Sequence, residues 1–176
     1  MQRQSIPLEE FVVKPQHLWD VQHLLLTSGD FAKGHFNTMT VGWGSLGVMW
    51  GMPFAQVVVR PTRYTYEFTE RYDTFTLCGF PQKYAPALQL LGSKSGRHGN
   101  KIAESGLTPI ASTKVAAPSF AEAELVLECH KIYWDDMAPA QFLDARIETK
   151  YPRKDYHRIY FGEIVAVLGG AQHKTG

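Results

Sequence analysis

The 176-residue chain has few cysteines and almost no excess charge of either sign. Its two cysteines, Cys78 and Cys129, are too few for a disulfide framework and fit a reducing compartment. Lysine and arginine number 18 and aspartate and glutamate 17, so the formal net charge is +1. Because duplex-DNA-binding proteins normally carry a strong basic excess, we expect no nucleic-acid partner. The start MQRQSIPLEEF lacks the apolar segment of a signal peptide, so a cytoplasmic protein is expected.

The sequence also lacks the common motifs for metal binding and for nucleophilic catalysis. It contains no HExxH, no CxxC and no cluster of His, Asp and Glu at ligand spacing, so no metal site is expected. No G-x-S-x-G is present, and Cys129 falls in an alternating apolar pattern typical of a buried side chain. Covalent catalysis by a side chain is therefore not expected.

One long stretch, from Gly34 to Val59, contains no Asp, Glu, Lys or Arg. Its length could span a bilayer, but it includes histidine, asparagine, threonine, serine, glutamine, proline and several glycines. A lipid-facing helix of that composition is insufficiently apolar, so we expect no membrane partner. The stretch is instead predicted to form buried β-structure, whose glycines let the backbone approach a flat, apolar ligand closely.

The remaining pattern predicts a mainly β protein with a few short helices. Strands are expected over 19–27, 36–43, 54–60, 74–80, 121–133 and 156–168. Short helices are expected over 61–71, with Thr62 as the N-cap, over 84–91 and within the basic loop 92–106. There is no βαβ rhythm and no glycine-rich dinucleotide motif, which favours an antiparallel barrel that forms a single domain over 1–176.

Two segments carry the donors that an anionic ligand needs. The first lies where a strand ends and a helix begins, and it contains Arg60, Thr62, Tyr64 and Thr65. Free backbone N–H groups and the helix dipole attract an anion at such a junction. The second is a glycine-flanked loop that contains Ser93, Lys94, Ser95, Gly96, Arg97 and Lys101. Together with the uncharged aromatic stretch, the two segments predict a ligand that has both an aromatic ring and a phosphate.

The order and spacing of several short motifs resemble those of the flavin reductase-like family, which includes the flavoredoxins. These motifs are NTMTVGW at 37–43, RPTRYT at 60–65, LGSKSGR at 91–97 with Lys101, and YHR at 156–158 leading to GEI at 162–164. The resemblance covers about residues 15–170, the expected core of the domain. It implies a split β-barrel that binds FMN, works as a homodimer and takes electrons from NAD(P)H.

The resemblance also implies roles for individual residues. Along the flavin ring it places Asn37, Thr38, Met39, Thr40, Gly42 and Trp43. On the phosphate side it places Arg60, Thr62, Tyr64 and Thr65. Over the ribityl chain, the phosphate or the ring edge it places Ser93, Lys94, Ser95, Gly96, Arg97 and Lys101. His157 is similar to the family's late histidine near the flavin face and is the candidate catalytic residue.

These features favour an FMN-dependent oxidoreductase whose electron acceptor the sequence does not identify. Three alternatives stay open: an electron carrier that holds FMN without reacting with NAD(P)H, a split barrel acting on another phosphorylated aromatic, as a pyridoxine-phosphate oxidase does, and a flavin-free barrel. The apolar residues Met49, Trp50 and Phe54 are expected at the surface. A second copy of the chain would cover them, as a homodimer requires.

Overall fold

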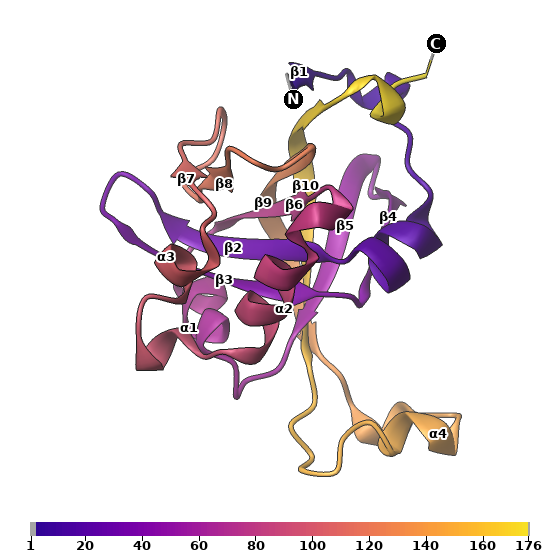
Figure 1. The fold of residues 1–176 in the computed structure, drawn as a ribbon. Coiled ribbons are helices and arrows are strands. Elements are labelled where there is room, and N and C mark those ends of the chain that lie inside the picture. Colours follow the sequence, from indigo (N-terminus) through magenta and orange to yellow (C-terminus); the bar gives the residue numbers. More distant parts are fainter. Residues whose placement is uncertain (1–2, 176) are drawn as a thin grey trace.

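The computed structural model describes residues 3–175 as one curled antiparallel sheet with helices packed outside it (Figure 1). The sheet contains eight strands: β1 (Gln4–Ser5), β2 (Leu24–Asp30), β3 (His35–Val41), β4 (Gly44–Met49), β5 (Met52–Val59), β6 (Thr74–Gly79), β9 (Leu125–Asp136) and β10 (Arg158–Gly169). Two further strands, β7 (Pro109–Ile110) and β8 (Ser119–Phe120), form a short ribbon of their own.

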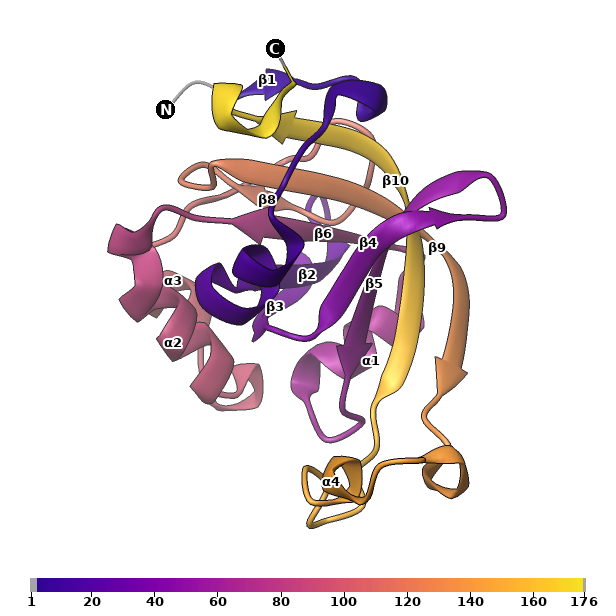
Figure 2. The same cartoon turned by 90° about the vertical axis from the view of Figure 1, so that its right-hand side faces the viewer.

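The sheet curls because of its longest strands, β9 and β10. The strand order is β3-β2-β6-β9-β10-β5-β4, and β1 pairs with the far end of β10. Pairing between β9 and β10 shifts register at Phe161/Gly162 and again at Ile164/Ala166. Such bulges bend a strand, and Figure 2 shows β10 curving along the molecule. The result is the expected antiparallel barrel, with β3 and β4 as the two end strands of the sheet.

The helices are short and lie mainly beside β2 and β3. They are α1 (Tyr64–Arg71), α2 (Ala85–Ser93), α3 (Lys101–Ser105) and α4 (Ala145–Glu148), with a π-helical segment, η2 (His17–Gln22). Single 3₁₀ turns are η1 (Leu8–Glu10), η3 (Gln82–Tyr84), η4 (Gly96–His98), η5 (Pro139–Gln141) and η6 (Ala171–His173). Helices α1 and α2 both pack on β3, whereas α4 lies apart from the barrel (Figures 1 and 2).

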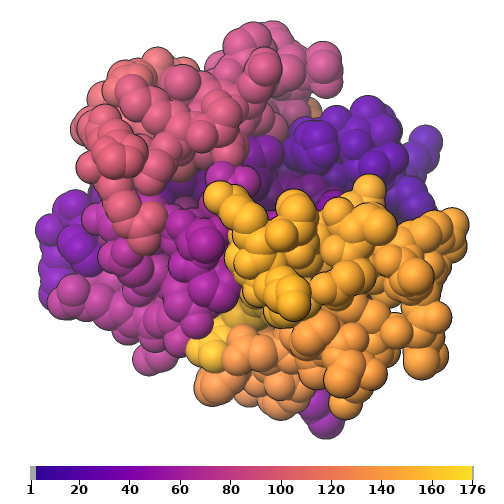
Figure 3. All heavy atoms as spheres, turned by 90° about the horizontal axis from the view of Figure 1, so that it is seen from below, coloured from indigo at the N-terminus to yellow at the C-terminus, as the bar shows by residue number. Residues whose placement is uncertain are grey.

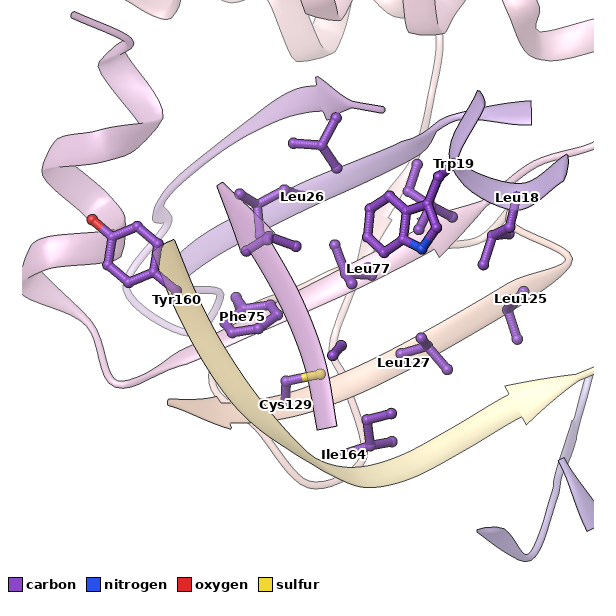
Figure 4. Close-up of a cluster of buried hydrophobic side chains, with 14 of the residues drawn as sticks. Leu18, Trp19, Leu26, Phe75, Leu77, Leu125, Leu127, Cys129, Tyr160 and Ile164 are labelled. Carbon is purple, nitrogen blue, oxygen red and sulfur yellow. The ribbon is translucent and has the colours of Figure 1, made fainter. Parts of the chain in front are cut away.

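Two apolar clusters hold the sheet and the helices together. The larger cluster fills the barrel and includes Leu26, Phe75 and Tyr160 (Figure 4). The smaller cluster lies under α2 and includes Leu25, Leu91, Phe120 and Val126. Strands β2, β6 and β9 contribute alternate residues to the two clusters, so both faces of these strands are buried.

The alternating apolar pattern over 121–133 predicts a strand with one exposed face, but the structure buries both faces of this strand over residues 125–129. Val126 belongs to the cluster under α2, and Glu128 is fully buried. The Glu128 carboxylate accepts hydrogen bonds from the backbone N–H groups of Thr113 (2.8 Å) and Lys114 (2.6 Å). A buried carboxylate needs such donors, and a loop distant in sequence supplies them.

The predictions for the first strand and the first helix are also wrong in detail. Trp19 lies in η2 rather than in a strand, because its ring packs inside the barrel against Gly44, and β2 begins only at Leu24. The N-cap of α1 is Arg63 rather than Thr62, and no side chain caps that helix end.

The uncharged stretch forms β3, β4 and β5, and sequence reasoning missed β4 as a strand. The turn after β4 leaves Val48, Met49 and Trp50 exposed, so this part of the stretch is not buried. Phe54, expected at the surface, is instead buried beside Phe161, with 5.0 Å between the ring centroids.

The bulge at Gly162 generates a stability prediction. A Cβ at this position would lie 2.4 Å from Cζ of Phe75 and 2.8 Å from Cβ of Cys129. Gly162→Ala should therefore lower the free energy of unfolding by about 1–3 kcal/mol in urea titrations, the usual penalty for overpacking. The control is Gly47→Ala in exposed β4, where the nearest ring atom is 3.2 Å away and can move. Equal unfolding free energies for the two variants would contradict this account.

Candidate functional site

The two predicted anion-binding segments meet around one small cavity of about 80 Å³, which we call the phosphate cavity. One wall is the start of α1, and the other is the end of α2 with the loop that follows it. Ten of the residues predicted to bind the cofactor line it: Asn37, Met39, Thr62, Tyr64, Thr65, Ser93, Lys94, Ser95, Gly96 and Lys101. Residues far apart in sequence therefore form one polar pocket.

The loop after α2 is held across this cavity by Arg97 and Gly96. The Arg97 guanidinium pairs with Glu67, donates to the carbonyl of Thr62 at 3.3 Å, and lies 5.0 Å from the centre of the Tyr64 ring. A Cβ on Gly96 would lie 2.5 Å from Oδ1 of Asn37, so only glycine allows this approach without displacement. Arg97 itself does not line the cavity; its contacts hold the loop in place.

Lys101 contributes a buried positive charge to the lining of the phosphate cavity. It is only 4% exposed, and its Nζ donates to the carbonyl of Leu91 at 2.8 Å. No carboxylate in the part of the chain that the structure describes forms an ion pair with it. Burial, with a smaller contribution from the Arg63 charge, lowers the pKa of Lys101 to about 8. An ammonium group has three donors, so two remain for an anion.

Arg63 is the cation that sequence reasoning passed over. It lines both the phosphate cavity and the neighbouring larger cavity. Its guanidinium donates only to the carbonyl of Gly92, at 3.4 Å, and forms no ion pair within residues 3–175. The motif RPTRYT contains two arginines, Arg60 and Arg63. Only the groups that each one contacts show which of them has a charge available for a ligand.

Arg60, the arginine that the sequence favoured, has partners within the protein. Its Nη1 lies 2.6 Å from Oδ1 of Asp155, and its Nη2 donates to the carbonyl of Lys150 at 2.9 Å. The guanidinium also lies 4.7 Å from the centre of the Tyr151 ring. Burial acts to raise the pKa of Asp155, but the Arg60 charge and hydrogen bonds more than offset this and leave it lowered. Arg60 therefore lines the larger cavity with its charge balanced.

That larger cavity, of about 360 Å³, lies beside the end of β3, and we call it the ring cavity. Six predicted residues line it: Met39, Thr40, Gly42, Trp43, Arg60 and His157. It shares Met39, Arg63 and Gly92 with the phosphate cavity, so the two cavities adjoin. His23, which the sequence did not single out, forms another wall, and a Cβ on Gly42 would lie 2.6 Å from its ring.

His157 is a buried, neutral histidine at the edge of the ring cavity. It is 8% exposed, and burial, with the nearby Arg60 charge, lowers its pKa to about 4. The Tyr151 hydroxyl lies 2.8 Å from Nδ1 of His157 and 3.2 Å from the sulfur of Met137. Because a thioether is a weak acceptor, the hydroxyl proton goes to Nδ1. The ring then keeps its own proton on Nε2 as a hydrogen-bond donor.

Two other predicted residues have their polar groups engaged elsewhere. Thr38 is fully buried between strands, where its hydroxyl donates to the carbonyl of Leu26 at 3.0 Å. Lys94 lines the phosphate cavity but is paired with both carboxylate oxygens of Glu104, at 2.6 and 2.7 Å. Over residues 3–175, no group of three or more His, Cys, Asp or Glu is arranged to hold a metal, and no helix is long and apolar enough to cross a membrane.

Comparison with known proteins gives the family. The model of the flavin reductase like domain matches residues 22–175. The chain belongs to this family. An uncharacterized protein from Archaeoglobus fulgidus is 25% identical over 173 residues, which cover 95% of this chain and 82% of that protein. The assignment confirms the resemblance found in the sequence, so this is a flavin reductase-like protein.

Two solved structures have the same fold. An FMN-binding domain of a flavin reductase-like enzyme from Shewanella baltica gives a TM-score of 0.70 at 18% identity, covering 97% of this chain and 78% of that one. The flavoredoxin of Desulfovibrio vulgaris gives 0.66 at 21% identity, covering 91% and 73%. These matches confirm the split-barrel fold of this flavin reductase-like chain.

The pKa of Lys101 generates a prediction for FMN affinity. A bound phosphate dianion favours the charged lysine and raises its pKa above the value of about 8 in the free protein. The affinity should therefore be constant just below about pH 8 and fall above it, by up to about tenfold per pH unit. Flavin fluorescence titrations between about pH 6.5 and 9.5 measure this dependence.

Two controls accompany that titration. Lys101→Met should bind FMN more weakly and lose the pH dependence, because the titrating charge is gone. Riboflavin, which lacks the phosphate, should show no loss of affinity near pH 8 with the unaltered protein. A pH-independent FMN affinity in the unaltered protein would show that Lys101 does not face the phosphate.

Proposed function

We propose that the chain is an FMN-dependent oxidoreductase that takes electrons from NAD(P)H. The observation that carries the proposal is the joined pair of cavities at the end of β3. One is small, polar and cationic, and the other is larger and lined by Trp43, Gly42 and His157. FMN has a phosphate at one end and a flat ring at the other. The two cavities match these two ends.

The residues present fit the phosphate of such a ligand. Among residues 3–175, Lys101 has donors without partners, Arg63 has a charge without a carboxylate, and the first turn of α1 has no side-chain cap on its N–H groups. These three features favour an anion at the same place. The assignment of five further residues to the phosphate side is supported by their position in the lining: Thr62, Tyr64, Thr65, Ser93 and Ser95.

The ring cavity fits a flat ligand that approaches the backbone. Gly42 lets the backbone lie close against the His23 ring, and Met39 and Trp43 supply apolar surface. FMN, when bound, supplies the redox chemistry, and the chain supplies binding, orientation and exclusion of water. His157, neutral at physiological pH, would donate a hydrogen bond from Nε2, and Tyr151 would hold it in that tautomer.

We further propose a cytoplasmic homodimer, formed through the β4–β5 turn. Val48, Met49 and Trp50 project there next to Tyr133, whose ring centroid is 5.8 Å from that of Trp50. Clustered exposed aromatic side chains are typical of protein interfaces, and two-fold pairing is the commonest way to cover them.

The function is tested on the purified full chain with added flavin. FMN should bind in a ratio of about one per chain and more tightly than riboflavin, since charged hydrogen bonds contribute about 1.5–3 kcal/mol. The FMN-loaded protein should then oxidise NADH or NADPH, followed by the loss of nicotinamide absorbance. The same preparation should have the mass of two chains by light scattering.

Each alternative gives a different result in that experiment, and a chain that binds no added FMN would be a flavin-free barrel. FMN binding without oxidation of either nicotinamide nucleotide would identify a flavin electron carrier. Weak FMN binding together with tight binding of pyridoxal phosphate would identify a protein for another phosphorylated aromatic. Tighter binding of riboflavin than of FMN would refute the phosphate cavity.

A further inference from the structure

A second hollow lies on the other side of Trp43 from the ring cavity. It has a volume of about 710 Å³ and is lined by Trp43 and by seven residues of 137–157, the long connection between β9 and β10, which we call the arm. The arm carries α4 and extends away from the barrel (Figures 1 and 2). Figure 3 views the molecule from this end, where the arm is orange.

The arm is anchored at its base. Arg60 donates to the carbonyl of Lys150 at 2.9 Å, and the backbone N–H of Met137 donates to the carbonyl of His157 at 3.0 Å. Tyr151 is 3% exposed, and its ring stacks on that of Phe142 with 6.0 Å between centroids. The hollow, which we call the arm pocket, therefore has a wall held in place by the barrel.

The lining of the arm pocket is aromatic and aliphatic with one unbalanced positive charge. Trp43, Met137, Ile147 and Tyr151 supply apolar surface. Arg146 also lines the pocket, but its guanidinium is paired with Asp144, with contacts of 2.6 to 3.1 Å. The Lys150 ammonium has no ion pair or hydrogen bond with any residue of 3–175. The lining, which also includes Asp144 and Thr149, thus combines apolar walls with a net positive charge.

We infer that the arm pocket binds a planar organic anion, an aromatic carboxylate in chemical class. The rings of Trp43 and Tyr151 provide surface for a flat apolar body, and Lys150 provides the charge that a carboxylate requires. Because Trp43 lines both hollows, a ligand in the arm pocket is separated from the ring cavity by one side chain. That it is a substrate of the flavin reaction rests on the proposed function, whereas its binding does not.

The position of Trp43 supports this assignment. The Trp43 side chain is 48% exposed, and its ring centroid lies 5.2 Å from that of His157. Tyr151 contacts His157 as well as lining the arm pocket. The two hollows thus share Trp43 as a wall and have the Tyr151–His157 hydrogen bond between them.

The probe is 2-naphthoate, titrated calorimetrically into the full chain without FMN and with saturating FMN, with the neutral 2-naphthamide for comparison. The carboxylate should bind once per chain and more tightly than the amide. Lys150→Gln should weaken naphthoate binding about five- to tenfold and remove its advantage over the amide, since the pair is partly exposed to water. Ile147→Asp should abolish binding of both probes, because it places a charge in the apolar wall.

Two matched controls use residues of the same arm outside the lining. Lys154→Gln removes an equal charge, and Leu143→Asp adds one at a side chain that is fully exposed. Both should leave the two dissociation constants unchanged. Absence of saturable binding, equal effects of Lys150→Gln and Lys154→Gln, or displacement of naphthoate by FMN would overturn the inference. Failure of FMN itself to bind is seen separately by absorbance and would refute the proposed function instead.

Discussion

The buried ammonium group of Lys101 ties together the parts of the candidate site. A charge in the interior is unfavourable unless polar groups surround it. The carbonyl of Leu91 at the end of α2 supplies one acceptor, and the negative end of the helix dipole adds to it. No carboxylate completes the arrangement within residues 3–175, and the pKa is accordingly low. A phosphate group would supply the missing acceptors without any rearrangement of the barrel.

The open edge of the barrel determines where a ligand can reach the Lys101 ammonium group. The bulges of β10 curl the sheet, so that its end strands β3 and β4, which are consecutive in the chain, approach each other without pairing within the described sheet. Gly42 and Trp43 lie in the link between these strands. The ring cavity, the phosphate cavity and the arm pocket are thus arranged around this link and the adjoining end of β3, and Trp43 is the wall shared by two of them.

Sequence patterns could predict five of the long strands and the family, and they singled out two polar segments that the fold brings together, because each of these depends on local composition and spacing. They could not separate Arg60 from Arg63. The distinction rests on Asp155, which is 95 residues from Arg60 and satisfies its charge. His23 and Tyr151 were missed for the same reason, since their roles come from contacts across the barrel. The burial of Glu128 likewise depends on a loop that no strand pattern encodes.

The central claim is that Lys101 and Arg63 hold the phosphate of FMN as a dianion. Phosphorus-31 NMR of FMN bound to the full chain measures this directly, through the pH dependence of the phosphate resonance. Free phosphate monoesters lose their second proton near pH ~6. Paired with two cations, the bound phosphate should keep its dianion shift to well below that pH. A bound resonance that titrates as it does in free FMN would contradict the account.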